Sequence, residues 1–209
     1  MDQENYTHLA FIIDRSGSME SIRDDMEGGI RALLASQAEL EGRLTVDIVT
    51  FDDVVEELYT DVPAAEITGD LIVPRGSTAL LDALGASIVR LKERLEARDS
   101  RSRPDQVLVI VVTDGMENAS TEYRIEQVRT SVERQRKGGW EFVFLGANID
   151  SFQVAGGLGF APSATMDYDA APGAVDSAMA STDRWIKSFR TGEGAAFTDE
   201  ERTSANRSD

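Results

Sequence analysis

The chain lacks cysteine altogether, and His8 is the single histidine among its 209 residues. Without cysteine no disulfide framework can form, and thiol chemistry is excluded. His8 begins a short apolar run, a position that favours a structural role over a catalytic one. The apolar runs are all too short to span a membrane, and the acidic start at residues 1–5 does not resemble a secretory signal. We therefore expect a cytoplasmic protein.

Basic residues are scarce. Lys and Arg number 21 against 38 Asp and Glu, which gives a formal net charge of −17. Nucleic-acid phosphates and anionic membranes would repel such a surface, so we expect neither as a partner. The same balance favours cations and basic patches on partner proteins.

Apolar runs alternate along the chain with segments of helical period, which predicts an α/β fold with a largely parallel sheet covered by helices on both faces. Asp52-Asp53 predicts a tight turn, which is followed by an antiparallel edge strand. We predict one domain over residues 1–190 and a polar, disordered tail over 191–209. The predicted strands cover 9–14, 44–51, 54–59, 107–112, 140–145 and 163–168, and the predicted helices cover roughly 22–34, 80–95, 121–137 and 175–189.

Three segments carry side-chain oxygens to places where predicted elements end or begin. The triplet Asp14-x-Ser16-x-Ser18 closes the first strand, Thr78 precedes a helix, and Asp114 closes the most apolar strand. If these two strands are neighbours, both carboxylates point into the crevice outside their carboxyl ends. Mg²⁺ prefers such oxygen ligands, so the five residues predict a site for a divalent cation.

These residues resemble a known family. Asp14-x-Ser16-x-Ser18, Thr78 and Thr113-Asp114-Gly115 are similar to the metal-ion-dependent adhesion site of von Willebrand factor type A (VWA) domains, and the resemblance covers roughly residues 6–189. It implies a Rossmann-like, doubly wound sheet of six strands. It also implies that Mg²⁺, or Mn²⁺ or Ca²⁺ in its place, mediates contact with an Asp or Glu of a partner protein. The segment at 144–150 resembles stand-alone bacterial or phage members.

Other interpretations stay open at this point. Taken singly, Ser16, Ser18 and Thr78 are ordinary turn or helix-cap residues. A metal-dependent hydrolase or phosphotransferase would also use strand-end aspartates, although Ser16 stands where an Asp-x-Asp motif has its second aspartate. A subunit of an ATPase or of a virion-associated assembly is a third possibility. We favour a binding module without enzymatic activity, because no general base accompanies the five oxygens.

The residues around the motifs allow two interpretations each. Arg15, Met19 and Glu20 either touch a partner or fill the loop, and Met116 either offers an apolar contact at the mouth of the site or merely completes its loop. For Glu117 and Asn118 a solvated loop is the favoured interpretation.

Overall fold

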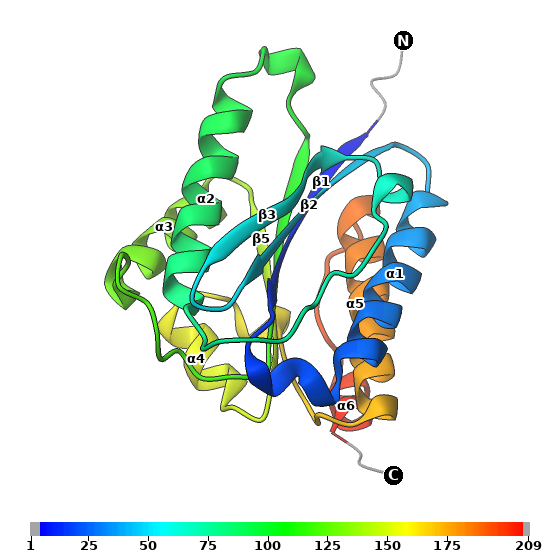
Figure 1. The fold of residues 1–209 in the computed structure, drawn as a ribbon. Coiled ribbons are helices and arrows are strands. Elements are labelled where there is room, and N and C mark those ends of the chain that lie inside the picture. The colour runs from blue at the N-terminus through cyan, green and yellow to red at the C-terminus, as the bar shows by residue number, and fades with distance from the viewer. Residues whose placement is uncertain (1–4, 207–209) are drawn as a thin grey trace.

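The computed structural model describes residues 5–206, in which six strands form one mixed sheet between two layers of helices (Figure 1). The order across the sheet is β3-β2-β1-β4-β5-β6, with β3 antiparallel to β2 and the other neighbours parallel. This confirms the predicted fold class, including the antiparallel edge strand. The strands are β1 (Tyr6–Asp14), β2 (Arg43–Phe51), β3 (Val55–Val62), β4 (Gln106–Thr113), β5 (Glu141–Ala147) and β6 (Thr165–Tyr168).

Alternation along the strands divides the core into two layers. On β1, Leu9, Phe11 and Ile13 pack with α1 and α5 on one face, whereas Ala10 and Ile12 pack with α2 on the other. None of the helices in residues 5–206 combines the length and apolar character that a membrane crossing requires. The helices are α1 (Arg23–Ala38), α2 (Leu80–Glu96), α3 (Ile125–Lys137), α4 (Ser151–Gly157), α5 (Pro172–Thr191) and α6 (Asp199–Ala205), with 3-10 turns η1 (Gly17–Ser21), η2 (Ala64–Glu66), η3 (Ser100–Ser102) and η4 (Pro162–Ala164).

The C-terminal segment differs from the predicted disordered tail over 191–209. Phe197 and Ala205 are buried, and α6 packs against α5 and β6. Thr198 and Glu201 form a capping box, in which each side chain accepts a hydrogen bond from the other residue's backbone N–H. The polar composition of this segment predicted disorder, but the segment contains a short capped helix and the fold continues past residue 190. Residues 207–209 lie outside the described part.

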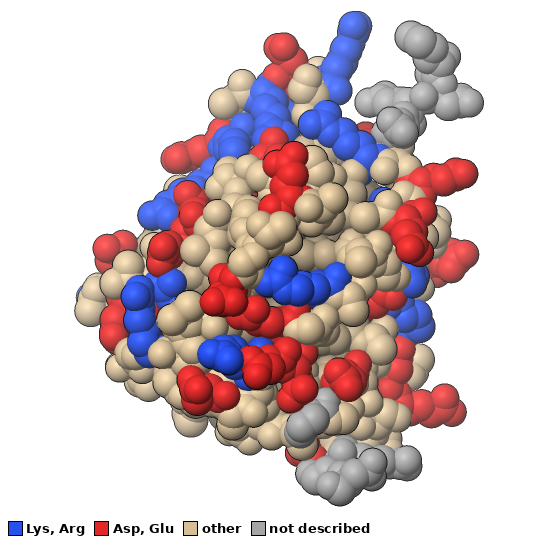
Figure 2. Space-filling view, turned by 45° about the vertical axis from the view of Figure 1, so that its right-hand side comes forward, with Lys and Arg blue, Asp and Glu red and all other residues tan. Residues whose placement is uncertain are grey.

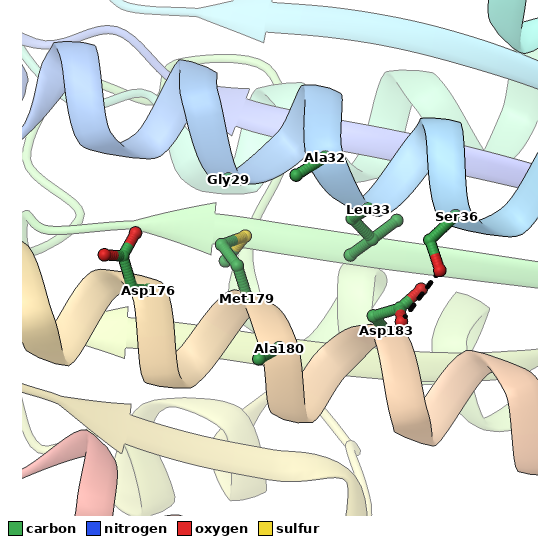
Figure 3. A pocket seen from close by; sticks show the side chains of 8 residues that line it. All are labelled: Gly29, Ala32, Leu33, Ser36, Asp176, Met179, Ala180 and Asp183. Carbon is green, nitrogen blue, oxygen red and sulfur yellow. Dashed lines mark hydrogen bonds between the residues drawn. The ribbon is translucent and has the colours of Figure 1, made fainter.

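Figure 3 shows α1 and α5 side by side, with Gly29 facing Met179. A Cβ on Gly29 would lie 2.5 Å from Met179 Cγ, so only glycine permits this approach of the two helices. Ser36 donates to Asp183 at 3.1 Å further along the same contact. Gly29 therefore serves the close contact between these two helices.

A polar cluster lies at the amino edge of the sheet, opposite the strand ends that carry Asp14 and Asp114. His8 is fully buried, with Nε2 3.3 Å from Asp47 Oδ2 and Nδ1 2.9 Å from Thr45 Oγ1. Asp47 also pairs with Arg94 and accepts the Asp61 N–H at 2.7 Å. The cluster ties β1, β2, β3 and α2 together, which agrees with a structural role for the histidine.

The Asp47 carboxylate should make the protein sensitive to acid. Burial alone would raise the pKa of Asp47, but the hydrogen bond and charge of His8 and the charge of Arg94 outweigh it and lower that pKa. A carboxyl whose folded pKa is depressed stabilises the fold above its unfolded pKa of about 3.9, and this stability is lost as pH falls through the folded pKa. We expect Asp47→Asn to cost about 3 kcal/mol at pH 7, because it breaks a buried ion pair.

Urea unfolding of wild type and Asp47→Asn across pH 2.5–7 measures this contribution. The difference in free energy of unfolding should stay constant near neutral pH and shrink below about pH 4. A difference independent of pH down to the acid limit would show that the pairing of the Asp47 charge contributes nothing.

Candidate metal centre

Strand pairing brings the two predicted aspartates to one edge of the sheet. β1 and β4 are parallel neighbours, with Ile13 opposite Val112. Asp14 is the last residue of β1, and Asp114 follows the last residue of β4. The predicted site required β1 and β4 to be neighbouring strands, and they are. The side chains of Asp14 and Asp114 are both buried, with 0% and 4% exposed.

Hydrogen bonds link the side chains of this edge. Asp14 accepts the Ser16 N–H at Oδ1 (2.7 Å) and the Thr113 hydroxyl at Oδ2 (2.6 Å). The Ser18 hydroxyl donates to Asp114 Oδ1 at 2.6 Å and lies 3.1 Å from Ser16 Oγ. The triplet after β1 and the aspartate after β4 thus form one connected group.

Gly115 marks the place where the third segment joins them. A Cβ on this glycine would lie 2.8 Å from Thr78 Oγ1 and 3.6 Å from both Asp14 Oδ2 and Ser16 Oγ. Oxygens from two remote stretches, Asp14 with Ser16 and Thr78, therefore surround one small space beside Gly115 on a third stretch. The structure brings together all five predicted residues: Asp14, Ser16, Ser18, Thr78 and Asp114.

The two carboxyls are held in an environment that disfavours their charge. Burial raises the pKa of Asp14, and the charge of Asp114 adds to it, although hydrogen bonds from Thr113 and Ser16 oppose the rise. Burial also raises the pKa of Asp114, against a hydrogen bond from Ser18. Two desolvated carboxylates this close repel each other, and a cation between them would relieve both costs.

The donor set fits a hard divalent cation. Asp114 Oδ2 is buried and has no hydrogen-bond partner within residues 5–206. The same part of the chain holds no group of three or more His, Cys, Asp or Glu side chains placed to bind a metal. The candidate centre instead combines two carboxylates with three hydroxyls, all of them oxygen ligands suited to Mg²⁺ or Mn²⁺.

The loop after Asp114 fixes Thr78 in place. Asn118 Oδ1 accepts the Thr78 N–H at 2.9 Å, and the Asn118 N–H donates to the Thr78 carbonyl at 3.0 Å. Glu117 accepts backbone N–H groups of its own loop and that of Leu81 at the start of α2. Both residues therefore position the site, a role that the favoured interpretation of a solvated loop had missed. The sequence held no signal for this role, because Leu81 lies 36 residues from Glu117.

A buried ion pair holds the loop after β1 from the other side. Arg15 is 5% exposed, and its Nε donates to Asp52 Oδ2 at 3.2 Å. Arg75 donates to the same oxygen, and its backbone N–H donates to the Arg15 carbonyl at 2.9 Å. Arg15 thus connects three loops around the site and is not a partner contact; Met19 is buried as well, whereas Glu20 is exposed.

α3 begins four residues later than predicted, and this delay also serves the site. Asp82 on α2 accepts the N–H groups of Thr121, Glu122 and Tyr123, which keeps residues 121–123 out of the helix. The loop between Asp114 and α3 is therefore tied to the same helix whose start carries Thr78.

No protein-family model matches the sequence, and a search of curated proteins finds no match either. Solved structures do match. Proximal thread matrix protein 1 from the mussel byssus, with a zinc-occupied MIDAS motif, aligns with a TM-score of 0.62 and 17% identity over 88% of this chain and 46% of its own. A von Willebrand factor type A protein from Catenulispora acidiphila gives 0.58 and 17% over 87% of this chain and 42% of its own.

Manganese-loaded TRAP protein of Plasmodium vivax aligns with a TM-score of 0.57 and 16% identity over 79% of this chain and 69% of its own. The chain thus spans less than half the length of the mussel and Catenulispora proteins. At these identities the likeness shows the fold, which is that of VWA domains. Two of the three similar structures carry a divalent metal, zinc in one and manganese in the other.

Proposed function

We propose that this chain is a metal-dependent protein-binding module. A divalent cation held by Asp14, Ser16, Ser18, Thr78 and Asp114 accepts an Asp or Glu of a partner protein. The convergence of Asp14, Ser16 and Thr78 oxygens around the space at Gly115, with Ser18 and Asp114 hydrogen-bonded to this group, carries the proposal. Mg²⁺ is the expected ion, with Mn²⁺ or Ca²⁺ as alternatives.

Each residue has a distinct task in this proposal. Asp14 and Asp114 together supply two negative charges, which balance a divalent cation. Ser16, Ser18 and Thr78 supply neutral oxygens that orient the ion without lowering its charge. When bound, the cation supplies an electron-poor centre with room for one more carboxylate. Because these five residues would hold the ion with one ligand each, a cation that prefers six ligands would still accept a carboxylate of the partner.

The surroundings favour a protein as the partner. One exposed apolar side chain lies beside the site: Met116, 68% exposed, follows Asp114 by two residues. An apolar group beside a charged centre suits a protein interface. Asp and Glu are scattered over the face in Figure 2, whereas many Lys and Arg gather near its top. Within residues 5–206, the large exposed apolar residues are Val54, Val73, Met116, Ile125 and Phe152.

The alternative of a hydrolase or phosphotransferase receives less support. A metal-dependent hydrolase needs a group that takes a proton from the attacking water. His8 lies at the amino edge, in the cluster with Asp47, and both aspartates of the site are assigned to the ion. The residues present therefore support binding more than turnover.

Metal titration and affinity capture test the proposal together. Isothermal titration of the EDTA-treated protein with MgCl₂ or MnCl₂ should show one saturable site. The immobilised chain should then retain a protein from cell extract with Mg²⁺, lose it in EDTA, and recover it when Mn²⁺ is returned. Binding that EDTA leaves unchanged would contradict the role of the metal. Turnover of a phosphate ester that requires the metal would favour the enzyme instead.

A further inference from the structure

Tyr168 carries a buried hydroxyl that the fold does not use. It is the last residue of β6, its side chain is 1% exposed, and it belongs to the same core layer as Leu145 and Met166. Its hydroxyl has no hydrogen-bond partner in residues 5–206 and no contact with solvent. Burying a polar group without a partner costs free energy, so apolar packing alone does not account for a tyrosine hydroxyl at this position.

The position of Tyr168 in the sheet places it beside the candidate metal centre. Tyr168 pairs with Ala147 at the end of β5, and Gly146 on β5 pairs with Thr113 at the end of β4. Tyr168 therefore lies at the same carboxyl edge of the sheet as Asp114, two strands away from it. Paired residues of parallel strands face the same side of the sheet, so Tyr168 and Ala147 lie on one face, in one core layer.

The charges around the phenol are carboxylates of the site. Burial raises the pKa of Tyr168, and the charges of Asp114, Asp14 and then Asp167 raise it further. The hydroxyl is therefore protonated at neutral pH and available as a donor among acceptors. Asp114 Oδ2 is itself buried without a partner, so the carboxyl edge of the sheet holds both an unused donor and an unused acceptor.

We propose that Tyr168 is a positioning residue of the metal centre, donating a hydrogen bond to Asp114 Oδ2 through one buried water. This inference rests on the proposed function, in which Asp114 is a ligand. Ser18 already holds Oδ1 of this carboxylate at 2.6 Å, so the second bond fixes the orientation of the whole group. A water bonded to both atoms would give each of them a hydrogen-bond partner. Such outer partners typically account for about 10- to 100-fold in metal affinity.

Tyr168→Phe tests the inference because it removes the hydroxyl and keeps the ring. In titrations of the full chain with MgCl₂ or MnCl₂, the affinity should fall about 10- to 100-fold. The urea midpoint of the metal-free protein should stay equal or rise, because the hydroxyl that is removed has no protein partner. Tyr6→Phe is the matched control. Its hydroxyl at the amino edge contacts Thr45, Asp61 and Arg98, so stability should fall while metal affinity stays unchanged.

The outcomes separate this inference from the proposed function. Wild type and Tyr168→Phe binding the metal equally well would overturn the role of Tyr168 and leave the metal centre intact. A Tyr168→Phe variant that loses stability as Tyr6→Phe does, with unchanged affinity, would show a purely structural hydroxyl and overturn it too. If wild type binds no metal, the proposed function fails and the inference fails with it.

Discussion

Asp14→Asn should lower the affinity for Mg²⁺ or Mn²⁺ by more than about 100-fold, because losing a ligand should exceed the roughly 10- to 100-fold effect of an outer-shell partner. Asn keeps the size of the side chain and can still accept the Ser16 N–H, which lies 2.7 Å from Oδ1. It removes one of the two negative charges that face the cation. Metal-dependent partner capture should disappear in parallel, and both can be measured by titration and by capture in Mg²⁺.

The same variant should not weaken the metal-free protein. Burial raises the pKa of Asp14, so the ionised carboxylate opposes folding at neutral pH, and Asp114 adds repulsion. A neutral side chain removes both costs, so the urea midpoint should stay equal or rise.

Asp105→Asn is the matched control. Asp105 lies before β4 at the amino edge, where it accepts the Tyr6 N–H at 3.0 Å, and its replacement should leave metal affinity unchanged. Equal loss in both variants would mean that overall charge, and not the site, governs binding. Undiminished binding by Asp14→Asn would remove Asp14 from the ligand set.

The fold could be predicted because its signals are local. A strand is predicted by the apolar run at 107–112, and a helix by the stripe of Leu80, Leu84 and Ile88. Neither prediction depends on contacts with distant residues. The turn at Asp52-Asp53 likewise indicated the antiparallel edge strand. From this alternation, the rules for parallel sheets led to a shared edge for Asp14 and Asp114.

What the sequence did not reveal depends on contacts between remote segments. The bond between Ser18 and Asp114 joins positions 96 residues apart, and no periodicity encodes it. The role proposed for Tyr168 follows only from its burial, its unpartnered hydroxyl and its place at the end of β6. α4 was not predicted because its seven residues include two glycines, and Asp150 capping the Gln153 N–H was its main signal. Short elements of this kind are set by tertiary packing.

Gly115→Ala should have the second large effect, because it places a methyl group among the ligands. The new Cβ would lie 2.8 Å from Thr78 Oγ1, closer than unstrained atoms approach. The Thr78 N–H donates to Asn118 Oδ1 and its carbonyl accepts the Asn118 N–H, so the backbone stays in place and the Thr78 side chain must turn its Oγ1 away from the site. We expect metal affinity to fall roughly 100-fold, as for displaced ligands, and stability to fall by about 1–3 kcal/mol, as for overpacking.

Gly28→Ala provides the matched control for this prediction. A Cβ on Gly28 meets no atom within 4 Å, and the residue lies inside α1. Replacing a helical glycine by alanine should raise stability by about 1 kcal/mol and leave metal affinity unchanged. Titration with MnCl₂ and urea unfolding distinguish the two variants. If Gly115→Ala binds the metal as tightly as wild type, the ion does not occupy the space around which Asp14, Ser16 and Thr78 converge, and the ligand set must be revised.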